Sequence, residues 1–266
     1  MAAPAFHPKP ILFHTKLIPA SVDPGVSSHD VTINPFTRLS ARLYLPPTAV
    51  ISPHPAKKLP IVMYFLGGGL CSFTAASAPY HNYFNSLASK GDVIAVSVDY
   101  RLAPKHPLPA AYGDSWEALL WLTSGCRGLD RHLEESGDFG MEVEGIALVH
   151  PFFWGNRAER RTTSAFRVEG FDALWPFVCP GSDGLDDPRR PLVSVAERDL
   201  LRERGVAYLN TLRGSEWGRE AVLFETKGKD HVFRRPDEKA TEFMCRLVGF
   251  FKGKNGPPGR DGCSLP

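Results

Sequence analysis

The sequence lacks the features expected of a membrane protein or a nucleic-acid-binding protein. No apolar stretch approaches the roughly 20 residues that a membrane-spanning helix needs. The 31 lysines and arginines almost balance the 29 aspartates and glutamates, and the net charge is only +2. A chain with so little excess charge offers no broad basic surface to phosphates or anionic lipids. We therefore expect neither a nucleic acid nor a membrane as a partner.

The sequence also lacks paired cysteines. No C-x-x-C pair or zinc-binding spacing occurs among the five cysteines, which are Cys71, Cys126, Cys179, Cys245 and Cys263. A scattered, odd-numbered set is typical of free thiols in a reducing compartment. The N-terminal segment MAAPAFHPKPILFHTKL is interrupted by prolines and lysines and does not resemble a secretory signal. These observations predict a soluble, cytoplasmic protein.

What the sequence does contain is a regular alternation of two kinds of segment. Apolar, β-branched runs occur at residues 41–45, 61–66, 93–98, 145–153, 191–197 and 221–226, and helix-like segments at 115–122, 200–212 and 237–252. Trp116, Leu119 and Leu120 share one face of the first of these helices. Near-continuous apolar strands are typical of a parallel sheet buried on both faces. The alternation predicts a doubly wound α/β fold.

Three segments do not follow this alternation. Residues 123–144 are polar, contain several glycines and are long for a loop inside a compact domain. Residues 154–190 carry aromatic side chains without a clear period, and we expect them to form a small cap together with the N-terminal segment. Residues 253–266 are rich in glycine and proline and predict a disordered tail. Residues 1–252 would then form a single domain.

Two residues that could perform acid–base chemistry follow consecutive strand candidates. Asp199 comes shortly after the run 191–197, and His231 comes five residues after the run 221–226. Consecutive strands are often neighbours, and α/β sheets bind ligands at the carboxyl ends of their strands. A carboxylate beside a histidine fixes its tautomer and stabilises the imidazolium. Alternatively, Asp199 caps the helix 200–212 and His231 is a surface loop residue, and spacing alone leaves both interpretations open.

Three glycines, Gly67, Gly68 and Gly69, follow the strand candidate 61–66. A glycine-rich turn can present backbone N–H groups to a developing oxyanion, and each such donor is worth roughly 3 kcal/mol. The alternative is an ordinary glycine turn at the end of a strand.

Six motifs in this order resemble those of the plant carboxylesterases, which belong to the hormone-sensitive-lipase-like branch of the α/β-hydrolase fold. The motifs are LGGGLCSF, SVDYRLAPKHPLPAAYGDSW, ALVHPFFWG, CPGSDGLDDP, VSVAERDLLRERG and GKDHVF, and the resemblance runs from about residue 20 to 252. It implies an α/β-hydrolase fold, a Ser–His–Asp mechanism and small carboxylic esters as substrates. It also implies that the protein needs no metal and no organic cofactor.

By position, the resemblance implies that Asp199 is the triad acid and His231 the triad base. Gly68 and Gly69 match the oxyanion-loop glycines, with Gly67 supporting the loop. The resemblance assigns a structural role, shaping the loop beside the site, to Asp99, Arg101 and Asp114. Two positions depart from the family pattern: Leu66 replaces the histidine of the His-Gly-Gly-Gly motif, and Lys105 replaces a glutamate.

The largest departure is that no Gly-x-Ser-x-Gly motif occurs in the chain. Family members continue from a GDFG sequence into a buried strand, then Gly-Asp-Ser-Ala-Gly, then a helix. This chain passes directly from Gly140 to Met141, so a unit of roughly 30 residues, the size of one β–α step, is missing. The expected fold is a mostly parallel sheet that lacks one central strand and its following helix. Its neighbours, 61–66 and 145–151, would keep unpaired backbone groups unless they pair directly.

Without this unit, the chain has no nucleophilic serine on a strand-to-helix turn. We do not expect Cys71, Ser72 or Ser115 to replace it, because that strained turn is what exposes the nucleophile. The sequence therefore predicts a carboxylesterase-like protein with little or no activity. Two alternatives stay open: a non-catalytic protein that binds a small apolar ligand, and a truncated splice or gene-model product without function.

Overall fold

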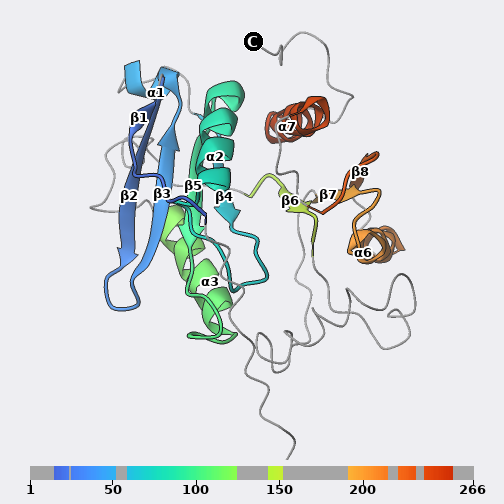
Figure 1. The fold of residues 1–266 in the computed structure, drawn as a ribbon, viewed down its shortest axis with the longest axis horizontal. Coiled ribbons are helices and arrows are strands. Elements are labelled where there is room, and N and C mark those ends of the chain that lie inside the picture. Colours follow the sequence, from blue (N-terminus) through green and yellow to red (C-terminus); the bar gives the residue numbers. More distant parts are fainter. Residues whose placement is uncertain are drawn as a thin grey trace, which may run out of the picture. The chain divides into compact units, whose positions relative to one another are not determined.

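The structure, a computed structural model, describes residues 15–23, 25–51, 59–124, 143–151, 191–214, 221–231 and 237–253 (Figure 1). The chain divides into two compact units. The first comprises Met1–Ala56, Met63–Ser89 and Val93–Glu135, and the second comprises Lys57–Val62, Lys90–Asp92 and Ser136–Pro266. The predicted cap at 154–190 lies outside the described residues, as do nearly all of the predicted tail and most of the loop 123–144.

A five-stranded sheet with the order β1-β2-β3-β5-β4 organises the first unit. Its strands are β1 (Val22–Asp23), β2 (Val26–Asn34), β3 (Leu39–Leu45), β4 (Ile61–Phe65) and β5 (Ile94–Asp99). The strands from β1 through β2 and β3 to β5 pair antiparallel, and Ser40 of β3 lies opposite Asp99 of β5. Strands β3 and β5 are almost entirely buried, as expected from their apolar sequences.

Three helices accompany this sheet, namely α1 (Pro47–Ile51), α2 (Ala78–Gly91) and α3 (Ala110–Thr123). Helix α2 buries Phe84 and Leu87. Helix α3 buries a face formed by small and polar residues as well as Leu122, namely Ala111, Asp114, Ala118 and Leu122. The apolar face that the sequence indicated is not the buried one, because Trp116 is 62% exposed and Leu120 is 49% exposed.

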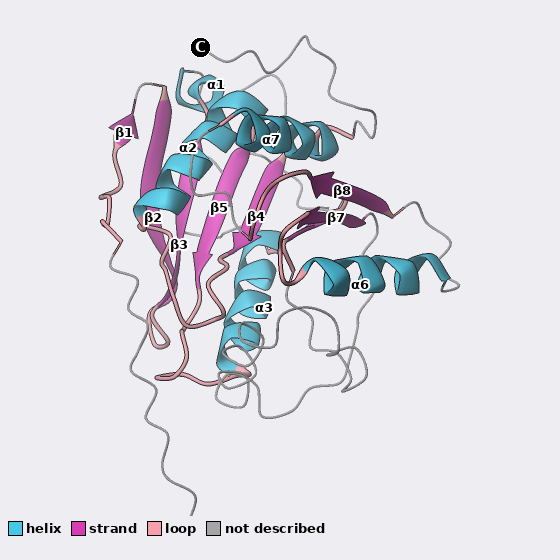
Figure 2. Cartoon of the chain, turned by 45° about the vertical axis from the view of Figure 1, so that its right-hand side comes forward, coloured by secondary structure: helices cyan, strands magenta, loops and turns pink. Residues whose placement is uncertain are grey.

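The three-stranded sheet of the second unit has the order β6-β7-β8 and is parallel throughout. It consists of β6 (Ile146–Val149), β7 (Pro191–Ala196) and β8 (Val222–Thr226). Helices α6 (Arg202–Gly214) and α7 (Glu238–Phe251) belong to the same unit, and Figure 2 labels them together with β7 and β8. A core cluster of Val193, Val195, Leu209 and Ala221 joins β7 to α6. Helix α7 begins where the sequence indicated, since the carboxylate of Asp237 accepts a hydrogen bond from the Ala240 N–H.

The α/β fold follows the prediction, with the parallel arrangement concentrated in the second sheet. The antiparallel pairs are β1–β2, β2–β3 and β3–β5, and the apolar pattern did not indicate β1 and β2. Strand β4 lies at one end of the first sheet and β6 at one end of the second. Each of these two strands therefore has one edge without a strand partner among the described residues.

The structure also bears on the predictions about membrane-spanning segments and about the cysteines. No helix within the described ranges is long and apolar enough to cross a membrane. Cys71 is a free thiol, whereas Cys245 on α7 is disulfide-bonded. The prediction that the cysteines are free thiols is therefore wrong for Cys245, and the cytoplasmic location predicted partly from it loses that support.

Candidate active site

Asp199 lies three residues beyond the end of β7 and three residues before the start of α6. Its side chain is only 1% exposed. One carboxylate oxygen, Oδ1, accepts a hydrogen bond from the Leu201 N–H at 2.8 Å. This contact ties the carboxylate to the turn that starts α6 and leaves the second oxygen, Oδ2, for other partners.

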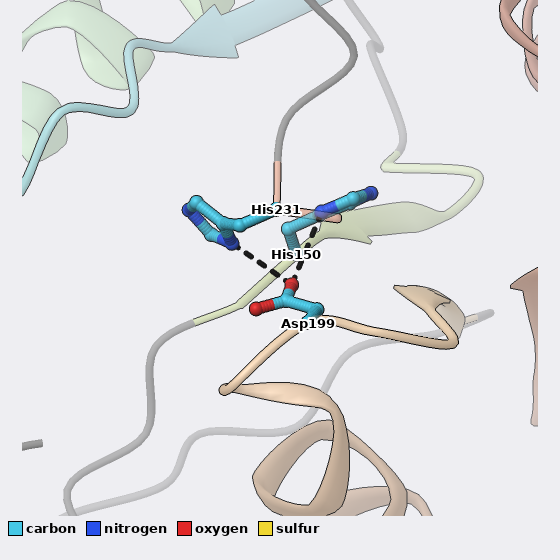
Figure 3. Close-up of side chains that lie close together, drawn as sticks. All are labelled: His150, Asp199 and His231. Atoms are coloured by element: carbon cyan, nitrogen blue, oxygen red, sulfur yellow. Dashed lines mark hydrogen bonds and ion pairs between the residues drawn. The ribbon is translucent and has the colours of Figure 1, made fainter. Parts of the chain in front are cut away.

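His231 supplies one of those partners. Its Nδ1 lies 2.8 Å from Oδ2 of Asp199, and its side chain is 41% exposed (Figure 3). The two loops meet because β7 and β8 are parallel neighbours and their backbones remain joined beyond the strands. The Glu197 N–H donates to the Thr226 carbonyl at 3.0 Å, and the Arg198 N–H donates to the Lys229 carbonyl at 2.9 Å.

Both sequence-based interpretations of Asp199 hold at once, one for each carboxylate oxygen. Oδ1 caps the turn before α6, and Oδ2 accepts the imidazole N–H of His231. An ionised carboxylate only accepts, so the contact fixes the His231 tautomer with its proton on Nδ1 and leaves Nε2 as the basic nitrogen. This arrangement can take a proton from a hydroxyl group placed at Nε2.

A second histidine, His150, contacts the same carboxylate and was not among the predicted site residues. Its Nδ1 lies 3.2 Å from Oδ2 of Asp199, and its side chain is 3% exposed. The imidazole rings of His150 and His231 pack edge to face with their centroids 5.4 Å apart. His150 directly follows β6, so the rule that drew attention to Asp199 and His231, a polar residue after a strand, could also have found it.

These hydrogen bonds decide the charge of Asp199. Burial alone would raise the pKa of its carboxyl group. The hydrogen bonds from His150, His231 and the Leu201 N–H outweigh burial and hold the pKa of Asp199 well below its usual range. The carboxylate is therefore ionised at neutral pH, as an acid that supports a basic histidine requires.

The three glycines form a tight turn in the first unit. Gly68 and Gly69 have φ values of 115° and 65°, which favour glycine. A Cβ atom on Gly68 would lie 2.6 Å from the Ser72 carbonyl oxygen. The loop is anchored at both ends, because the Tyr100 hydroxyl donates to the Leu66 carbonyl and the Ala103 N–H donates to the Leu70 carbonyl at 2.9 Å. Hydrogen bonds to the loop's backbone carbonyls thus hold it, although Leu66 has no polar side chain.

The residues considered as substitute nucleophiles are placed as follows. Ser115 lies inside α3, and its hydroxyl donates to the Ala111 carbonyl at 2.7 Å. Cys71 and Ser72 belong to the glycine turn, where the Cys71 thiol lies 3.4 Å from the Gly68 carbonyl oxygen. None of the three lies on a strand-to-helix turn of the kind that exposes a catalytic serine.

The residues assigned a structural role form buried polar contacts. Arg101 and Asp114 form an ion pair at 2.7 Å, with the Asp114 side chain 1% exposed. The Asp99 carboxylate accepts from the Ala75 N–H at 2.6 Å. These contacts join the end of β5 to the loop before α2, and the segment after β5 to α3.

Comparison with known proteins identifies the family to which the chain belongs. A sequence profile for the α/β hydrolase fold matches residues 62–149. The chain is 36% identical to probable carboxylesterase 2 of Arabidopsis thaliana, and the match covers 89% of each protein. The chain belongs to the plant carboxylesterase family. It is also 36% identical to the chloroplastic tuliposide A-converting enzyme 2 of Tulipa gesneriana, over 90% of this chain and 74% of that family member.

The alignments also show a difference in length. The match to the Arabidopsis carboxylesterase runs over 285 residues, which exceeds the 266 residues of this chain, although only 89% of the chain takes part. The match to the tulip enzyme runs over 286 residues. Both alignments therefore pass over residues of the plant carboxylesterases that have no counterpart here.

Solved structures agree on the fold. A carboxyl esterase of the fungus Tuber melanosporum matches with a TM-score of 0.67 at 18% identity, covering 94% of this chain and 93% of that one. An esterase of Pyrobaculum calidifontis matches with a TM-score of 0.61 at 23% identity, covering 85% and 84%. At these identities the likeness establishes the α/β-hydrolase fold, and the plant relatives carry the assignment to the carboxylesterases.

Proposed function

We propose that this chain is a carboxylesterase-like protein that keeps the acid–base pair of its family but has little or no esterase activity. In this proposal Asp199 is the triad acid, His231 is the base, and Gly68 and Gly69, supported by Gly67, form the oxyanion loop. Small carboxylic esters are the ligand class. The observation that carries the proposal is a hydrogen-bonded Asp199–His231 pair in a chain without a Gly-x-Ser-x-Gly motif.

The length difference supports this proposal. The plant relatives align over more residues than the chain possesses, in agreement with an internal unit that is absent here. A strand, a nucleophile turn and a helix inserted after Gly140 would account for much of that difference. Loss of the triad serine alone lowers turnover on the order of a million-fold in another serine hydrolase.

The exposed apolar side chains give further support. In chain order the missing unit would lie between α3 and β6. Three large side chains of α3, namely Tyr112, Trp116 and Leu120, are exposed. Single exposed apolar residues are ordinary, but a series spaced along one helix indicates a surface that usually has a cover. A β–α unit would supply such a cover.

The test is direct. The purified chain is incubated with an activated aryl ester and with a fluorophosphonate probe, beside a plant carboxylesterase that contains the motif. We expect ester turnover and covalent labelling only in the comparison enzyme. Labelling of this chain that disappears in the His231→Ala variant would show that another residue serves as nucleophile, and the proposal of inactivity would fail.

A further inference from the structure

Three side chains from three separate loops direct ligand atoms toward one another in the second unit. They are His150 after β6, Asp199 after β7 and His231 after β8 (Figure 3). One candidate ligand atom from each side chain can be chosen so that all three lie within 4.8 Å of one another. Two imidazoles and a carboxylate form a donor set that suits zinc and similar transition metals better than magnesium or calcium.

The two distances from Asp199 to the histidines are near those of a metal site. Around a tetrahedral zinc ion with bonds of 2.0–2.2 Å, neighbouring ligand atoms lie about 3.3 Å apart. Oδ2 of Asp199 lies 3.2 Å from Nδ1 of His150 and 2.8 Å from Nδ1 of His231. These two distances are shorter than the zinc value by about 0.1 Å and 0.5 Å. The distance between the two histidine ligand atoms has to be set by a movement of His231, the one ligand that is partly exposed.

The surroundings hold two of the three ligands in place. Oδ1 of Asp199 accepts the Leu201 N–H, so Oδ2 is the oxygen presented to the histidines. The backbone of His150 has a φ of 49°, uncommon for a residue with a side chain, and its N–H donates to the Ser194 carbonyl at 2.9 Å. Such contacts orient ligands before a metal arrives, as the outer-shell hydrogen bonds of metal sites do.

We propose that His150, Asp199 and His231 bind one divalent transition-metal ion, with zinc as the probe of choice. Three protein ligands leave a fourth position, which a water molecule can fill. On binding, each imidazole turns its Nδ1 lone pair to the metal and carries its proton on Nε2. Metal binding and the acid–base pair are therefore alternative states of the same three side chains, and the ion would withdraw His231 from proton transfer.

The experiment uses the full chain, expressed without a histidine tag, treated with a chelator and dialysed. Zinc and cobalt are titrated by calorimetry, and the cobalt protein is examined for the strong visible absorption of a four-coordinate ion. We expect one ion per chain. The variants His150→Gln and His231→Gln should each weaken binding by at least about tenfold, the lower end of the effect of losing an outer-shell partner.

Two controls make the result decisive. His106→Gln removes a histidine of the first unit and should leave the affinity unchanged. Circular dichroism establishes that each variant is folded; if His150→Gln fails to fold, His231→Gln, a change at a partly exposed side chain, still decides the question. Absence of binding, or binding of equal strength in wild type and both ligand variants, would overturn the proposal. Ester hydrolysis plays no part in these measurements, so the outcome is independent of the proposed function.

Discussion

The imidazole Nδ1 of His231 lies 2.8 Å from Oδ2 of Asp199, although 32 residues separate the two in the chain. The pair exists because β7 and β8 are parallel neighbours that deliver their following loops to the same edge of the sheet. Asp199 is almost completely buried and ionised, so its partners matter for stability as well as for chemistry.

Replacing Asp199 by Asn should therefore destabilise the protein by roughly 2–4 kcal/mol, the range for breaking a buried, hydrogen-bonded charged group. The asparagine oxygen can still accept the Leu201 N–H, but its NH₂ group would face the N–H groups of two histidines. Urea denaturation at pH 7 measures the loss. Asp230→Asn, a matched change at an exposed aspartate in the same loop as His231, should have almost no effect.

The loss of stability in Asp199→Asn should depend on pH in a definite direction. Because the pKa of Asp199 is lowered in the folded protein, its contribution is fully present above the unfolded pKa of about 4 and is lost as the pH falls below it. The stability difference between wild type and Asp199→Asn should shrink on acidification below about pH 4. A difference that stays constant would contradict the assignment of an ionised, hydrogen-bonded carboxylate.

If the proposed function is correct, inserting the strand, nucleophile turn and helix of a relative should produce esterase activity. We expect that a strand, Gly-Asp-Ser-Ala-Gly and helix from a plant carboxylesterase, inserted between Gly140 and Met141, makes the chain reactive toward a fluorophosphonate. Turnover of an activated aryl ester should rise by several orders of magnitude, since in the proposed function the serine is the group that limits turnover. Labelling followed by mass spectrometry identifies the modified residue.

The matched control carries alanine in place of the inserted serine and should not be labelled. His231→Ala in the active insertion variant should abolish turnover, which connects the restored nucleophile to the existing base. An insertion variant that folds cooperatively yet is neither labelled nor active would indicate that the missing unit is not what limits this chain.

Much of the described part of the second unit could be predicted from sequence because its strands are apolar runs, and β7 is buried throughout. The apolar runs 191–197 and 221–226 correspond to β7 and β8, and their order located Asp199 and His231. His150 was missed because it lies within a longer apolar run, 145–153, of which only Ile146–Val149 forms the strand. Local pattern did not reveal where that strand ends.

The first unit was less predictable for two physical reasons. Strand β2, with the sequence VSSHDVTIN, pairs antiparallel and buries few apolar side chains, so it shows no continuous apolar run. Helix α2 contains Tyr, Asn, Ser and Gly, which are weak helix formers, and owes its stability to tertiary burial of Phe84 and Leu87. Local propensity alone does not distinguish the sequences of β2 and α2 from those of loops.

Asp99 provides a second pH-dependent prediction, with the opposite sign to Asp199. Burial raises its pKa from 3.8 to about 6, even though the Ala75 N–H donates to it. A raised folded pKa means that the contribution of this group is greatest below about pH 4 and is lost as the pH rises through about 6. Wild-type stability should fall across this window on account of Asp99.

Asp99→Asn keeps an oxygen for the Ala75 N–H and removes the titration. The free energy of unfolding of the variant, relative to that of wild type, should rise by on the order of 2 kcal/mol between pH 4.5 and pH 7.5. Urea denaturation at both pH values measures this change. The exposed Asp230→Asn change should show no such gain. Parallel curves for wild type and Asp99→Asn would mean that Asp99 remains ionised throughout.

Gly205 allows a test of the packing that positions Asp199. A Cβ atom at this position would lie 2.7 Å from Cγ1 of Val195, a fully buried residue of β7. In Gly205→Ala, the higher helix propensity of alanine should add about 1 kcal/mol to the free energy of unfolding, and overpacking should remove about 1–3 kcal/mol. Urea denaturation can resolve the net loss. Gly214→Ala is the matched control, because nothing lies within 4 Å of its Cβ, and it should be neutral or slightly stabilising.

The double variant Gly205→Ala with Val195→Ala separates overpacking from other causes. If the helix and strand are held apart by the added methyl group, shortening Val195 should recover part of the loss, and the double-mutant cycle should show coupling above 0.5 kcal/mol. Asp199 lies between β7 and α6 in the chain, so displacement of α6 should also alter the Asp199–His231 contact. A shift of the His231 imidazole resonances in Gly205→Ala that is reversed in the double variant would show that β7–α6 packing sets the geometry of the acid–base pair. Additive stability effects together with unchanged resonances would refute this role of the packing.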